Sequence, residues 1–124
     1  MTLDKKALLA AWSDEHTAAR AARDQGDRAG EWHHLERAHI LSQPLAGPHV
    51  RTHAAMFGAA VRRRNVKEIV GQLVRLVVAG PGSVTGRYPV GNTGGANVSA
   101  LAPMPIPDDL RALLGDAVPT KEPV

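Results

Sequence analysis

The residues with the clearest chemical potential are six histidines, which all lie between His16 and His53. The chain has no cysteine, so a disulfide and a thiolate metal site are both excluded. Glu36 and His39 are three positions apart, a spacing that places both side chains on one side of a helix. Glu-x-x-His is the ligand pair of carboxylate-bridged metal sites in helical bundles. The spacing therefore indicates a metal site.

Two further segments extend this candidate site. His49 and His53 are four positions apart, so they also share one helix face. Glu15 lies on an apolar helical stripe, where a lone buried carboxylate is costly unless it finds a partner, a proton or a metal. Nitrogen and oxygen ligands of this kind suit Fe, Mn, Zn or Cu. The predicted metal ligands are Glu15, Glu36, His39, His49 and His53. His34 is a reserve ligand or a hydrogen-bond partner of one.

The same residues also fit a metal-free interpretation. Glu-x-x-His spacing occurs on only one predicted helix, and a two-metal bundle site needs it on two, which favours a mononuclear site or a site completed across a homodimer. Alternatively, Glu36 pairs with a neighbouring arginine or with His53, and His39 is a hydrogen-bonded core histidine. Glu15 has its own alternative, an ion pair with Arg20 or with an arginine of another helix. The residue types and their spacing fit the metal site and the polar core alike.

The elements that position these residues are predicted to be helices. Asp4, Asp27 and Asn65 are suited to cap helix N-termini, and apolar residues recur at helical spacing after each of them. We expect an all-α fold of four antiparallel helices in two hairpins, loosely like a tetratricopeptide repeat, with a long Gly/Pro-rich loop and a short C-terminal helix. The predicted helices span 4–25, 27–42, 48–63, 66–79 and 108–114 of one domain over 1–118, followed by a tail over 119–124.

The predicted helix over 66–79 is apolar around most of its wheel, so we expect it to be central. The loop over 80–107 has no helical period, but its apolar residues predict an ordered wrap around the helices. If the loop folds over the histidines, Asn92, Thr93 and Asn97 would shape the pocket, and Arg87 would hold a carboxylate or a ligand. A weaker interpretation is an anion or nucleotide site at Arg87 and this loop.

Composition excludes several other functions. The net charge is +3 and only 3% of residues are aromatic, so the signature of a nucleic-acid-binding protein is incomplete. No apolar run resembles a signal peptide or is long enough to span a bilayer, so we expect a cytoplasmic protein without a membrane segment. The chain lacks the Gly-x-Ser-x-Gly elbow, which argues against a serine hydrolase.

Four motifs resemble a family of small bacterial proteins. They are Leu-Glu-Arg-Ala-His-Ile-Leu at 35–41, His-Val-x-x-His at 49–53, Gly-Asn-Thr-Gly at 91–94 and Pro-Met-Pro-Ile-Pro at 103–107. The family is a domain of unknown function of about 120 residues, within the single-domain size range. The resemblance implies no established activity and assigns no residues. The family is loosely associated with gene neighbourhoods for heavy-metal resistance, which favours a metal site.

These observations lead to one main hypothesis and one alternative. The main hypothesis is a small helical protein that binds a divalent transition metal at a His/Glu site between its first three helices, for metal handling or metal-dependent catalysis. The alternative is a metal-free helical module that binds a partner protein or a small ligand. Whether the chain is an enzyme stays open.

Overall fold

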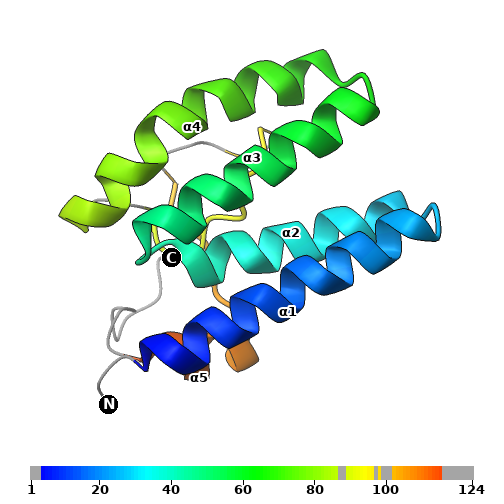
Figure 1. The fold of residues 1–124 in the computed structure, drawn as a ribbon. Coiled ribbons are helices and arrows are strands. Elements are labelled where there is room, and N and C mark those ends of the chain that lie inside the picture. Colours follow the sequence, from blue (N-terminus) through cyan, green and yellow to red (C-terminus); the bar gives the residue numbers. More distant parts are fainter. Residues whose placement is uncertain (1–3, 87–88, 97, 99–101, 116–124) are drawn as a thin grey trace.

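The computed structural model describes residues 4–86, 89–96, 98 and 102–115, and the described part of the chain is helical without strands (Figure 1). The predicted all-α class is therefore confirmed. The helices are α1 (Lys5–Asp24), α2 (Arg28–Ser42), α3 (Ala46–Arg62), α4 (Val66–Thr85) and α5 (Asp108–Leu114).

Three of these helices begin at side-chain caps that the sequence predicted. The side chain of Asp4 accepts a hydrogen bond from Ala7 N, and Asp27 does the same from Gly30 N at α2. Asn65 accepts from Glu68 N at the start of α4. Each cap satisfies one backbone donor that the first helical turn leaves free.

The end of α4 differs from the prediction. The sequence predicted a helix over 66–79 that stops before Pro81, but α4 continues through Pro81 to Thr85. Proline removes the bond to the carbonyl four residues earlier, that of Val77, and both residues are exposed, so water can replace it. Gly86 ends the helix in the left-handed conformation at φ +71°, as a C-terminal glycine commonly does.

The helices pair as two antiparallel hairpins (Figure 1). α1 packs along α2, α3 packs along α4, and α2 lies beside α3, so the two hairpins meet through their inner helices. Met56 and Ala59 of α3 are fully buried and pack with Leu35 of α2 and Ala19 of α1. An ion pair between Arg62 of α3 and the buried Glu31 of α2 also joins the hairpins.

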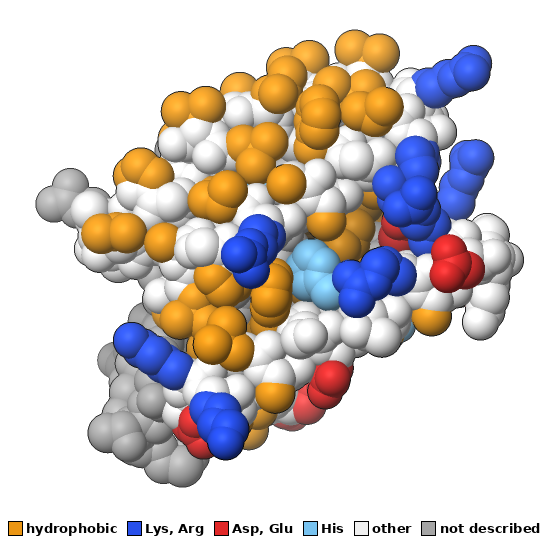
Figure 2. All heavy atoms as spheres, in the orientation of Figure 1, with side chains coloured by type: hydrophobic (Ala, Val, Ile, Leu, Met, Phe, Trp, Pro, Cys, Tyr) orange, Lys and Arg blue, Asp and Glu red, His pale blue; other side chains and the backbone are white. Residues whose placement is uncertain are grey.

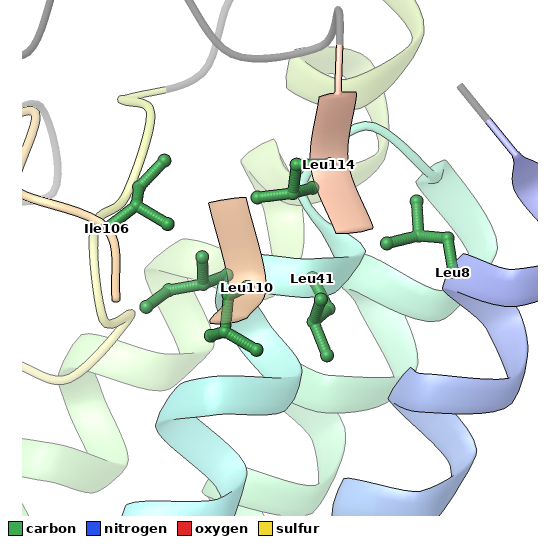
Figure 3. Packing of buried hydrophobic residues seen from close by; sticks show 6 residues of the cluster. Leu8, Leu41, Ile106, Leu110 and Leu114 are labelled. Carbon is green, nitrogen blue, oxygen red and sulfur yellow. The ribbon is translucent and has the colours of Figure 1, made fainter. Parts of the chain in front are cut away.

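The C-terminal helix closes a second apolar cluster (Figure 3). Leu110 and Leu114 of α5 pack against Leu41 of α2 and Leu8 of α1, and Ile106 joins them from the preceding segment. All five side chains are buried, so this cluster fixes the end of the long loop against the first hairpin.

The loop that leads to this cluster is anchored by a buried glutamine. Gln43 donates from Nε2 to Pro89 O and accepts at Oε1 from Gly91 N. Gly91 has φ +78° and packs so closely on the chain that an added Cβ would lie 1.9 Å from Met104 O. Within the described residues, the loop therefore runs against the end of α2 and back along itself.

None of the described helices is both long enough and apolar enough to cross a membrane.

Candidate metal centre

Three histidines meet in the interior between α2 and α3. His39 of α2 and the α3 pair His49 and His53 are all buried, with 3–5% of their surface exposed. His39 Nε2 lies 3.0 Å from His53 Nε2 and 3.0 Å from His49 Nε2. The ring centroids are 4.6–4.9 Å apart. The sequence predicted that these three residues share a site, and the helix spacing it relied on brings them together.

The opposite nitrogen of each ring contacts an oxygen outside the cluster. His39 Nδ1 lies 2.6 Å from the carbonyl oxygen of Asn92, in the loop. His53 Nδ1 lies 2.6 Å from Gln72 Oε1, and His49 Nδ1 lies 2.7 Å from Ser83 Oγ, both on α4. The three imidazoles thus point outward with Nδ1 and inward with Nε2.

Hydrogen bonds around the acceptors decide which nitrogen carries the proton. The Asn92 carbonyl can only accept. Gln72 uses its Nε2 as a donor to Glu68 Oε1 and Gly94 O, so its Oε1 must accept from His53. The Ser83 hydroxyl donates to Gln43 O at 2.5 Å, so its oxygen accepts from His49 Nδ1.

Each ring is therefore a neutral imidazole with its proton on Nδ1 and its lone pair on Nε2. Three lone pairs then face one another at the centre of the cluster. This is the arrangement in which histidines ligate a metal while oxygen acceptors fix their tautomers and orientations.

Burial keeps these rings neutral. It lowers the pKa of His49 and of His53 to about 4 and holds the pKa of His39 well below its usual range, with the neighbouring histidines adding to the effect at His39 and His49. All three nitrogens are therefore free of a competing proton at neutral pH, as metal ligation requires.

The loop covers the cluster at close range. Gly94 has φ +86°, and a Cβ added there would lie 2.6 Å from His39 Cδ2 and 2.9 Å from its Nε2. Only glycine fits this position, because the left-handed conformation and the short distance to the ring both exclude a side chain. Glu68 supports the loop by accepting a hydrogen bond from Ala96 N.

The other two predicted metal ligands, Glu15 and Glu36, are not part of this histidine cluster. The Glu15 carboxylate accepts a hydrogen bond from Arg37 Nε at 2.8 Å and lies 2.7 Å from His34 Nδ1. The Glu15 carboxylate is therefore held by α2 side chains and is not part of the group of ligand atoms that the three histidines form. Glu15 thus forms an ion pair with Arg37 and a hydrogen bond with His34.

Glu36 lies one turn before His39 in α2, but its carboxylate is not part of the group of possible ligand atoms that the three histidines form. Burial raises the pKa of Glu36, and the nearby Thr93 and His33 oppose that rise. Thr93 Oγ1 is buried near Glu36, but no described residue forms a hydrogen bond of good geometry with it. Arg87 and Asn97 lie outside the described residues.

The sequence reasoning missed the acceptors on α4. Glu68, Gln72 and Ser83 follow one another at intervals of four and eleven positions, which is one face of a helix. They form a polar stripe along an otherwise apolar helix, a pattern that an ordinary solvent-facing stripe shares.

One comparison with known proteins gives a match. Residues 6–114 match the family described as "Protein of unknown function (DUF3703)". The chain belongs to this family. The match confirms the expected membership in a family of unknown function, and it assigns no activity to the chain. No curated protein and no solved structure matches it.

Proposed function

We propose that this protein binds one divalent transition-metal ion at His39, His49 and His53. The observation that supports the proposal is the convergence of three Nε2 lone pairs while each Nδ1 is held by an oxygen acceptor. Without an ion, three lone pairs at this separation repel one another unless one Nε2 takes a proton at the expense of its outer hydrogen bond.

The ligand set favours particular metals. Three neutral imidazoles suit Zn, Cu, Fe and Ni better than Mg or Ca, which prefer oxygen ligands. Three protein ligands would leave at least one coordination position of a four-coordinate ion for water, an anion or a further ligand. Metal handling and metal-dependent catalysis are both compatible with such an open position.

The test is metal analysis of untagged protein. Purified protein saturated in turn with Zn²⁺, Co²⁺, Ni²⁺ and Cu²⁺ and then desalted should hold one ion per chain for at least one of them. His39→Ala and His53→Ala should lose that ion. His33→Ala is the matched control, since His33 is exposed and lies outside the cluster.

If the wild-type chain holds well under one ion for every metal, the proposal is wrong. The cluster would then be a hydrogen-bonded polar core, and a metal-free binding module becomes the better hypothesis. Retention of the ion by both histidine variants would also reject the site.

A further inference from the structure

Helix α4 is oriented with polar side chains inward and apolar side chains outward. Its buried residues include Glu68, Gln72, Arg75 and Ser83. Its outer face, which we call the α4 apolar face, consists of Val66, Val70, Leu73, Val74, Val77, Val78 and Val84, each of them 49–78% exposed. In Figure 2, hydrophobic side chains gather along the upper edge, where Figure 1 places α4. The expectation that this helix is central was wrong. Its polar side packs on the histidine cluster, and no described residue covers its apolar side.

The size of this face is that of an interface. α4 has 20 residues and is therefore about 30 Å long. Seven valine and leucine side chains that are half exposed or more present roughly 600 Å², the upper limit for a patch on a monomer. With a rim of neighbouring atoms the area approaches the about 800 Å² per partner of a standard protein interface.

Charge indicates what covers this face. Its seven residues are uncharged, and the nearby exposed cations, Arg64 and Lys67, lie at one end of α4. A helix that binds a lipid surface carries cations along its flanks, which α4 does not. A uniform apolar stripe is complementary to itself, as a twofold interface between identical chains requires.

The same cations select the direction of pairing. In a parallel pair, both copies of Lys67 would meet at one end and repel. In an antiparallel pair they lie about 21 Å apart along the helices, beyond the screening length of about 8–10 Å, and each faces the negative end of the other helix dipole. We propose that the α4 apolar face is the interface of an antiparallel homodimer, with its twofold axis near Val74.

This arrangement would place the two histidine clusters on opposite sides of the paired α4 helices, because the acceptors of each cluster project from the inner face of its own α4. The inference does not depend on metal binding.

The first test is the mass of the full chain in solution. Sedimentation equilibrium of the metal-free protein should give twice the chain mass of 13.1 kDa at micromolar concentration. Val74→Glu and Val77→Glu should weaken the dimer at least 100-fold. Leu9→Glu is the matched control, because it replaces an exposed leucine on α1 and should leave the dimer intact. Circular dichroism checks that each variant remains helical. A monomeric wild-type chain, or a dimer that persists in both helical α4 variants, would overturn the proposal.

The second test uses the absence of cysteine from the chain. A single Val74→Cys should form a disulfide-linked dimer on mild oxidation, whereas Val66→Cys alone should not. Mixed Val66→Cys and Val84→Cys chains should cross-link with each other. Cross-linking of Val66→Cys alone as fast as Val74→Cys would overturn the antiparallel arrangement. If the wild-type protein is monomeric and floats with anionic phospholipid vesicles, the dimer proposal is wrong and the α4 apolar face binds lipid instead.

Discussion

Replacement of Gln72 by leucine tests the proposed metal centre without touching a ligand. Gln72 Oε1 accepts from His53 Nδ1 at 2.6 Å, and its Nε2 donates to Glu68 and to Gly94 O. Leucine has a similar volume but cannot accept or donate a hydrogen bond. The Gln72→Leu protein should keep its three histidines and bind metal more weakly.

The magnitude follows from what happens at His53. If its proton stays on Nδ1, a buried N–H loses its partner, which costs about 1–3 kcal/mol. If the proton moves to Nε2, it points at His39 Nε2, 3.0 Å away, and an incoming metal must displace it. Removal of such partners from metal-ligating histidines typically weakens binding about 10–100-fold. We expect a Kd change in that range, equivalent to about 1.4–2.8 kcal/mol.

The assay is a competition titration against a chromophoric chelator at pH 7.5, with Co²⁺ absorption as a report on coordination. Gln43→Leu is the matched control. It removes two buried hydrogen bonds from the loop, to Pro89 O and from Gly91 N, but none from a histidine. Both variants should be less stable to urea. Equal metal affinities for Gln72→Leu and Gln43→Leu would refute the view that this amide fixes the His53 tautomer.

Two further predictions concern the packing and the protonation of the cluster. Gly94→Ala should weaken metal binding and shift the Co²⁺ spectrum, because the added Cβ would collide with the His39 ring. Gly86→Ala is the control, because Gly86 also has a positive φ but has open space around it, so this variant should lose stability alone. Identical metal affinity in the two variants would contradict the collision. In the metal-free protein, the pKa of His49 and of His53 is about 4, below the unfolded value of about 6.5, so the stability from their neutral forms is complete above about pH 6.5 and is lost as the pH falls towards 4. Each of these two histidines should lower the free energy of unfolding by about 2 kcal/mol at pH 5 relative to pH 7.5, as measured by urea unfolding. An unchanged urea midpoint would contradict their burial as neutral groups.

Local patterns explain what could be predicted from the sequence. Capping side chains such as Asp27 and Asn65 act within one turn, so their positions predict where helices begin. The i, i+4 spacing of His49 and His53 fixes a shared face before any tertiary contact is known. The helical class, the three capped helix starts and the shared face of His49 and His53 therefore followed from the printed residues.

Tertiary contacts explain what the sequence reasoning missed. The spacing of Glu36 and His39 places them on one side of α2, but of the two only His39 contributes to the group of ligand atoms. Glu15 was correctly read as needing a partner, but nothing local shows that the partner is Arg37. The orientation of α4 also went unpredicted, because a polar stripe that serves a buried site looks like an ordinary solvent face.

The acceptors of the cluster have a consequence for how the protein folds. His39 is separated by 53 positions from the carbonyl at position 92, and His49 by 34 from Ser83. Each hairpin can form from contacts between neighbouring helices, but these bonds close long stretches of chain and carry a larger entropic cost. The histidines should therefore come together before their tautomers are fixed. The metal-competent geometry should be a late product of folding, acquired only when the loop has docked.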